Sequence, residues 1–232
     1  MLKDTVKWFH LALGHPGKSR LKASINARYH SQSLSHAIET FRCEACTEHK
    51  ADTRGWGLLP EREVTAEPFS EVAVDLIGPW KVNVGKRTLE FNALTCIDMT
   101  SNLVKLARIK NKTSRHVSHL FARNWLARYP RPDKCIHDNG GEFIGQEFQA
   151  VLRDHEIRSA NTTSKNPQAN AVCERMHQTV ANILRTLLHG TRLKSEGQAN
   201  DIIDEALVLA MYAMRSTVHT TLCSTAGSAL DV

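Results

Sequence analysis

The chain has 232 residues, of which 41% are hydrophobic, so it is long and apolar enough to form one or two folded domains, and bulk disorder is excluded. No apolar run approaches the roughly 18 residues of a membrane span, and the start of the chain lacks the apolar core of a signal peptide. Only one pair among the six cysteines is closely spaced, which favours a reducing, intracellular compartment with a metal rather than disulfides as the staple.

Residues 1–50 contain two short-spaced pairs of metal-ligating side chains. His10 and His15 are followed, after 27 residues, by Cys43 and Cys46. Zinc needs four N/S ligands in a tetrahedron, and two such pairs separated by a helical span provide them. The helical patterning lies near residues 18–25 and 35–40. Because so short a segment buries little apolar surface, zinc would supply folding free energy. Two alternatives are that the histidines are solvated helix residues, or that another histidine is a ligand, with the candidates being His30, His36 and His49.

A linker rich in charge, Gly and Pro is expected at 51–68, and a second domain at 69–232. Thr113 is a good N-cap for a helix that would run to Tyr129. Strands followed by alternating helices and strands predict an α/β fold with a mixed sheet flanked by helices. The expected strands are near 71–77, 89–98, 102–109 and 156–161 with one ending at Asp138, and the other helices are near 145–155, 167–189 and 198–217.

Three acids of this domain occupy positions that suit a metal-binding carboxylate. Asp75 lies in an apolar run that predicts a buried strand, stopped by Gly78-Pro79. Asp138 ends a strand and leads into a tight turn. Glu174 is separated from Asp138 by 35 intervening residues and lies inside a predicted amphipathic helix. Spacing alone is weak support, because the chain has 24 acidic residues.

Two long segments contain almost no acids. Residues 101–132 have eight basic residues and no acid, and residues 157–194 have six basic residues and Glu174 as the one acid. Each segment alone could be a solvated face. Together, on both sides of the candidate carboxylates, they predict a surface for the phosphate backbone of nucleic acid. The candidate contact residues are Lys105, Lys110, Lys112, Arg115, Lys165 and Arg175.

Four sequence blocks carry a resemblance to a known family. IHDNGGEF (136–143) and NPQANAVCERMH (166–177) resemble the D-N-G-x-E-F and N-P-Q-x-N-x-x-x-E-R blocks of retroviral and retrotransposon integrases, and VDLIGP (74–79) resembles their first-aspartate strand. LGHPG (13–17) resembles a segment of their zinc-binding H-H-C-C domain. The chain thus resembles the integrase of a gypsy-type LTR retrotransposon over nearly its whole length.

The resemblance implies an RNase H-like catalytic core preceded by a small helical zinc domain with His10, His15, Cys43 and Cys46 as ligands. Asp75, Asp138 and Glu174 would be catalytic and would hold two Mg²⁺ or Mn²⁺ ions. The implied activity is 3′-end processing and strand transfer of element cDNA into target DNA. The implied partners are double-stranded DNA and further copies of the chain, in the nucleus and without a membrane.

The alternative is a retroelement remnant or domesticated protein that binds DNA or chromatin without joining strands. Family members usually continue into a C-terminal binding domain, whereas this sequence ends at Val232. In addition, Ser224-Thr225 stands where the family commonly has Thr-Pro.

Overall fold

The computed structural model describes residues 2–50, 67–161, 167–188, 193, 195–219 and 224–225. Most of the predicted linker, residues 51–66, lies outside this part, and the domain boundaries stay predictions. The N-terminal region is helical, as predicted. Its helices are α1 (Leu2–Ala12), α2 (Lys18–Asn26), α3 (Leu34–Thr40) and α4 (Glu44–His49).

The N-terminal helices enclose a small apolar core of their own. Its largest members include Phe9 on α1, Leu21 and Ile25 on α2, and Leu34 and Ile38 on α3, all of them buried. The sequence analysis predicted α2 and α3 and missed α1 and α4. The missed helices carry or flank the metal-ligand candidates, since His10 lies on α1 and Cys46 on α4.

The remainder is built on a mixed five-stranded sheet with the order β3-β2-β1-β4-β5. The pairs β1–β2 and β2–β3 are antiparallel, whereas β1–β4 and β4–β5 are parallel. This confirms the predicted fold class. The first two strands are longer than expected and form an extended hairpin. The strands are β1 (Glu71–Val84), β2 (Arg87–Asp98), β3 (Val104–Ile109), β4 (Lys134–His137) and β5 (Arg158–Asn161).

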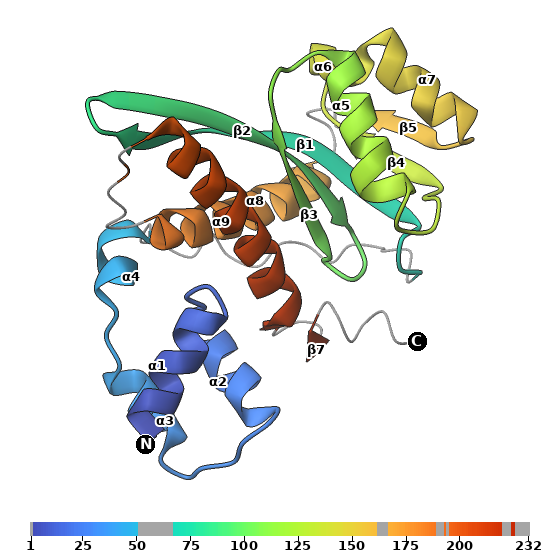
Figure 1. Ribbon diagram of the computed structural model, residues 1–232. Helices are drawn as coiled ribbons and strands as arrows, with labels where there is room; N and C mark the ends of the chain where they lie inside the picture. Colours follow the sequence, from blue (N-terminus) through green and yellow to red (C-terminus); the bar gives the residue numbers. More distant parts are fainter. Residues whose placement is uncertain are drawn as a thin grey trace.

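Helices cover both faces of the sheet (Figure 1). One face carries α5 (Ser114–Phe121), the short α6 (Gly141–Ile144) and α7 (Gln146–Asp154); the other carries α8 (Pro167–Leu187) and α9 (Glu196–Ser216). The Thr113 hydroxyl caps α5 by accepting from the His116 amide, as its position predicted. A small hairpin, β6 (Val218–His219) and β7 (Ser224–Thr225), follows α9.

One predicted helix differs from its expected form. The segment after Thr113 is α-helical only to Phe121 and continues as a π-helical turn, η1 (Ala122–Leu126). Here the Ala127 amide donates to the Ala122 carbonyl five residues back, at 2.9 Å. This wider turn carries Trp125, whose side chain is completely buried.

The alternation of side chains along β1 determines where Asp75 points. Val72 and Val74 pack with the core under α5 and α7, whereas Ala73 and Ile77 pack with the core under α8 and α9. Side chains two residues apart share a face of a strand. Asp75 therefore faces α8, the helix on which Glu174 lies.

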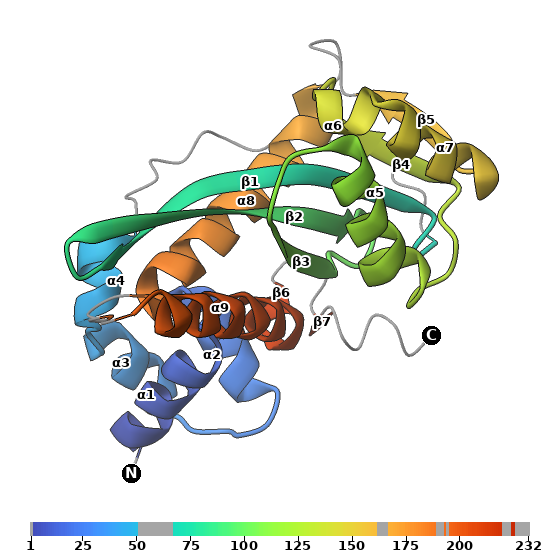
Figure 2. The same cartoon turned by 45° about the horizontal axis from the view of Figure 1, so that its top comes forward.

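The N-terminal helices rest on the outer side of α8 and α9, so that these two helices lie between them and the sheet (Figures 1 and 2). The contact is close at Gly14, where an added Cβ would lie 2.6 Å from Cβ of Ala213 and 3.2 Å from Cγ2 of Ile183. The Val218 amide also donates to the Ser24 hydroxyl on α2, at 3.1 Å.

Candidate metal centre and carboxylate cleft

The structure brings His10, His15, Cys43 and Cys46 together, with one ligand atom of each within 4.8 Å of all the others. Sγ of Cys43 lies 3.3 Å from Nδ1 of His15, and Sγ of Cys46 lies 3.3 Å from Nε2 of His10 and 3.6 Å from Nδ1 of His15. In a tetrahedral zinc site with bonds of about 2.3 Å to sulfur and about 2.0 Å to nitrogen, S···N distances are about 3.5 Å. The donor set and its spacing therefore fit zinc.

Burial controls the protonation of this cluster. It lowers the pKa of His10 to about 4, with further lowering by the neighbouring His15 and Lys50, so the imidazole is neutral and can ligate at physiological pH. Burial also raises the pKa of the Cys46 thiol to about 11. Metal binding at Cys46 must therefore displace a proton. The competing candidates His30, His36 and His49 are not part of the cluster.

Asp75 lies in the middle of β1, opposite Thr95 of β2. Its Oδ1 accepts a hydrogen bond from the Leu76 amide at 2.7 Å. Burial raises its pKa to about 6, the Leu76 amide opposes that rise, and the charges of Asp138 and Glu142 add to it. The first predicted acid is therefore half-buried and lies within electrostatic reach of two other carboxylates.

Asp138 directly follows β4, the parallel neighbour of β1. Its Oδ1 accepts from the Gly140 amide at 2.8 Å. A Cβ at Gly140 would lie 2.9 Å from this Oδ1 and 3.0 Å from Cδ of Glu142. A side chain at Gly140 would therefore crowd the carboxylates of both Asp138 and Glu142. Sequence reasoning left Glu142 outside the triad, although it belongs to the same block.

Glu174 projects from α8 into a cleft of about 760 Å³ between that helix and β1. The strand side of the cleft is the segment from Leu76 to Lys81, where the register against β2 shifts between Ile77 and Trp80. Bulges of this kind redirect side chains near functional sites. Trp80 packs against Phe91 and also lines the cleft. Arg185 lies on the helix side, so the cleft has basic groups beyond its acidic end.

His177 is a cleft residue that the sequence analysis missed. It lines the same cleft and lies three residues after Glu174 on α8. Its Nδ1 is 3.6 Å from Oδ2 of Asp75, and its Nε2 is 3.1 Å from Oγ1 of Thr95. The spacing of i and i+3 on a helix was the signal available in the sequence, because such residues share a face.

The two sites differ in how tightly their ligand atoms are gathered. Within the described residues, only the histidine–cysteine cluster has three or more metal-ligating atoms grouped closely enough for one ion. Asp138 acts on the pKa of Asp75, and Glu174 lies on α8, the helix that Asp75 faces; that the three acids share one metal site stays a prediction. Asp98, the last residue of β2, is completely buried and accepts hydrogen bonds from the amides of Phe69 and Ser101, which is a structural role.

The predicted DNA contacts lie in several places. Lys105 on β3 is held over the Tyr129 ring, with its Nζ 5.4 Å from the ring centroid. Lys110 and Lys112 are exposed before α5, and Arg115 is exposed on its first turn. Lys165 and the side chain of Arg175 lie outside the described residues. DNA contact by these residues stays a prediction.

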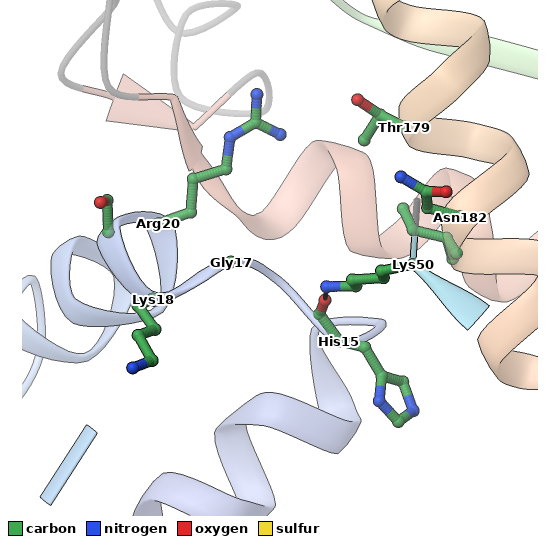
Figure 3. A pocket seen from close by; sticks show the side chains of 9 residues that line it. His15, Gly17, Lys18, Arg20, Lys50, Thr179 and Asn182 are labelled. Atoms are coloured by element: carbon green, nitrogen blue, oxygen red, sulfur yellow. Dashed lines mark hydrogen bonds between the residues drawn. The ribbon is translucent and has the colours of Figure 1, made fainter. Parts of the chain in front are cut away.

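A second hollow, of about 330 Å³, lies between the N-terminal helices and α8 (Figure 3). Thr179 and Asn182 of α8 stand opposite Arg20, and the Lys50 ammonium donates to the His15 carbonyl. Lys18 points out of the hollow and pairs with Glu39 at 2.9 Å. Lys50 thus ties the end of α4 to the loop that carries a metal ligand.

Comparison with known proteins places the chain among mobile genetic elements. It is 39% identical over 194 residues to the Retrovirus-related Pol polyprotein from transposon TNT 1-94 of Nicotiana tabacum, covering 82% of this chain and 14% of that polyprotein. It is 23% identical over 192 residues to the Transposon Tf2-3 polyprotein of Schizosaccharomyces pombe, covering 80% of this chain and again 14% of the relative. The chain therefore corresponds to a small segment of these proteins. No family model matches it.

Solved structures agree on the fold. An integrase chain of the simian T-cell lymphotropic virus intasome, in complex with the PP2A regulatory subunit B56 gamma, superposes with a TM-score of 0.61 at 19% identity, covering 96% of this chain and 70% of that one. The catalytic core domain of BIV integrase gives 0.53 at 18% identity, covering 69% and 92%. The fold is that of retroviral integrases.

The chain is a relative of retrotransposon Pol polyproteins. It has the architecture of a retroviral-type integrase and contains the histidine–cysteine cluster. None of the helices in the described part of the chain is long and apolar enough to cross a bilayer.

Proposed function

We propose that this chain is the integrase segment of a retrotransposon polyprotein, and that it joins 3′ ends of element cDNA to target DNA by metal-dependent phosphodiester chemistry. The observation that carries the proposal is the placement of Asp75. This half-buried carboxylate faces α8 from the centre of an integrase-type sheet, and Asp138 and Glu142 are close enough to raise its pKa. Similarity to retrotransposon polyproteins and integrase folds supports the same reaction class.

The carboxylate cleft fits a hard divalent cation. Oxygen ligands suit Mg²⁺ and Mn²⁺, and the half-buried charge of Asp75 is disfavoured by the neighbouring acids unless a cation offsets it. In both Asp75 and Asp138, one carboxylate oxygen accepts a hydrogen bond from a backbone amide, and this bond fixes the orientation of the carboxylate. The HTLV-2 integrase catalytic core has been solved in complex with magnesium and superposes here with a TM-score of 0.53 at 20% identity, covering 69% of this chain and 95% of that one.

Divalent ions bound there would activate the attacking oxygen and stabilise the leaving oxygen. The chain's own contribution is positional. Asp75 offers a carboxylate from the rigid centre of the sheet, Asp138 from the end of the adjacent strand, and Glu174 from the facing helix. The cleft beyond them carries Lys81 and Arg185, which can hold phosphates of a DNA end.

We further propose zinc at His10, His15, Cys43 and Cys46, with a structural role in docking the N-terminal helices. Double-stranded DNA and further copies of the chain are the proposed partners, and the nucleus is the expected place of reaction. Val208 and Tyr212 of α9 are 58% and 46% exposed, and such apolar side chains are consistent with self-association.

The test is a strand-transfer assay with labelled oligonucleotide duplexes in Mg²⁺ or Mn²⁺, together with its reversal on a branched duplex. Asp75→Asn, Asp138→Asn and Glu174→Gln should each abolish joining while leaving the fold intact. Glu147→Gln, at an exposed acid on α7, is the matched control and should retain activity. Activity within a few-fold of wild type in a triad variant would remove that residue from the site. DNA binding without joining in zinc-loaded wild-type protein would favour the non-catalytic alternative.

A further inference from the structure

The imidazole of His177 lies against the carboxylate of Asp75, the first of the three candidate acids. It projects from α8 with a side chain that is 18% exposed, and its Nδ1 faces Oδ2 of Asp75 at 3.6 Å. Its other nitrogen, Nε2, lies 3.1 Å from the hydroxyl of Thr95. The position of the ring is therefore fixed at both ends, by β1 and by β2.

The hydroxyl of Thr95 determines which nitrogen of His177 carries the proton. This hydroxyl has one proton, and it donates it to the Asp75 carbonyl at 3.0 Å. Towards the imidazole, Thr95 can then act only as an acceptor. Nε2 of His177 is the donor to it, and a neutral ring presents the lone pair of Nδ1 to Asp75.

In its charged form, the carboxylate of Asp75 has no proton to donate to Nδ1 of His177. Its Oδ1 already accepts from the Leu76 amide, so Oδ2 is the oxygen that meets the imidazole. Two lone-pair donors, Oδ2 of Asp75 and Nδ1 of His177, thus lie 3.6 Å apart beside the cleft. Neighbouring ligands of one transition-metal ion are about 3 to 3.5 Å apart, so 3.6 Å requires only a small adjustment.

We propose that Nδ1 of His177 is a nitrogen ligand of the ion held at Asp75, and that it makes the carboxylate cleft prefer Mn²⁺ to Mg²⁺. Imidazole suits first-row transition metals, whereas Mg²⁺ is bound by oxygen and water. The inference rests on the proposed metal site at Asp75. It adds a residue and a metal preference that the three carboxylates alone do not provide.

Pulsed EPR of Mn²⁺ bound to the zinc-loaded, full-length chain tests this ligand directly, without any measurement of activity. The wild-type protein should show nitrogen hyperfine modulation on the bound Mn²⁺. His177→Asn replaces the ring nitrogen with an amide oxygen of similar reach and should abolish that modulation. By calorimetry it should weaken Mn²⁺ binding by about tenfold and Mg²⁺ binding by less than about twofold. His119→Asn, at an exposed histidine on α5, is the matched control and should change neither.

Asp75→Asn separates this inference from the proposed function. If Asp75→Asn abolishes Mn²⁺ binding but the wild-type spectrum shows no nitrogen modulation, His177 is not a ligand and the inference is overturned, while the metal site stands. Equal loss of Mn²⁺ and Mg²⁺ affinity in His177→Asn would also overturn it, because the ring would then only position Asp75. If Asp75→Asn leaves Mn²⁺ binding unchanged, the carboxylate site itself fails, and the inference fails with it.

Discussion

Replacing Gly14 with alanine should disturb the docking of the N-terminal helices on α8 and α9. Gly14 has φ +63°, in the left-handed region, where a side chain costs about 1–2 kcal/mol. Its new Cβ would also lie 2.6 Å from Cβ of Ala213, and overpacking of this kind costs about 1–3 kcal/mol. We therefore expect a total of about 2–5 kcal/mol, a substantial part of the roughly 5–15 kcal/mol that stabilises a typical domain.

Two other glycines separate these contributions. Gly85 has φ +58° with nothing within 4 Å of its added Cβ, so Gly85→Ala should show the backbone cost of about 1–2 kcal/mol alone. Gly17 has neither a positive φ nor a near neighbour, and Gly17→Ala should cost less than about 1 kcal/mol. The stability that Gly14→Ala loses beyond the loss in Gly85→Ala measures the cost of the steric conflict at the interface with α9. Removing the opposing methyl with Ala213→Gly should restore part of the stability, although glycine in a helix itself costs about 1 kcal/mol.

The assay combines urea unfolding with hydrogen exchange and zinc content. Gly14→Ala should accelerate amide exchange on α8 near Ile183 and on α9 near Ala213, while zinc stays bound, because the ligands belong to the N-terminal helices. A cost no larger than that of Gly85→Ala, without coupling to Ala213→Gly, would refute the close approach of Gly14 to Ala213. Loss of zinc in Gly14→Ala would instead place the defect in the loop between His10 and His15.

Two further predictions concern the zinc cluster and the basic run. Cys43→Ser should release one zinc per chain and unfold the N-terminal helices while the sheet domain stays folded; zinc-free, folded wild-type protein by metal analysis would contradict this. DNA affinity should fall steeply with salt, and replacing Lys110, Lys112 and Arg115 with alanine should reduce the salt slope by roughly one unit for each DNA phosphate that is no longer neutralised. An unchanged slope would make this run an ordinary solvated face.

The sequence predicted well what local pattern determines. Alternation and apolar runs located the strands, and the two short-spaced ligand pairs located the zinc cluster, because ligands only a few residues apart are held near each other by the local backbone. The prediction missed α4, whose six residues are too few to show a helical period. It also missed α1, although the buried Val6 and Phe9 share one face of that helix. It also ended β1 at Ile77, since Gly78-Pro79 is a usual stop signal, whereas the strand passes this point through a register shift.

The environment of Asp75 could not be predicted from spacing. His177 and Glu142 meet it only because α8 crosses under β1 and the turn after β4 folds back at Gly140. The spacing of Glu174 and His177 shows that they share a helix face, but it does not show which strand that face meets, and no local pattern brings Glu142 near Asp75. The same holds for Gly14, whose neighbours Ala213 and Ile183 lie on two other helices.

The two candidate metal sites, the histidine–cysteine cluster and the acids around Asp75, differ in how their ligands are arranged before a metal binds. In the histidine–cysteine cluster, burial raises the pKa of the Cys46 thiol, so this thiol loses its proton only when a metal binds, and the four ligand atoms already lie within 4.8 Å of one another. At Asp75, burial and the charges of two acids raise the pKa of the carboxyl group, and one backbone amide lowers it. No cation among the described residues contributes to the shift. Asp138 and Glu142 disfavour the charged form of Asp75, and the partial burial of Asp75 disfavours it further. A divalent ion removes both penalties at once, so the acids should draw together only as it binds. We therefore expect the histidine–cysteine cluster to hold its metal as part of the fold, and the proposed site at Asp75 to take up its metal as part of the proposed reaction.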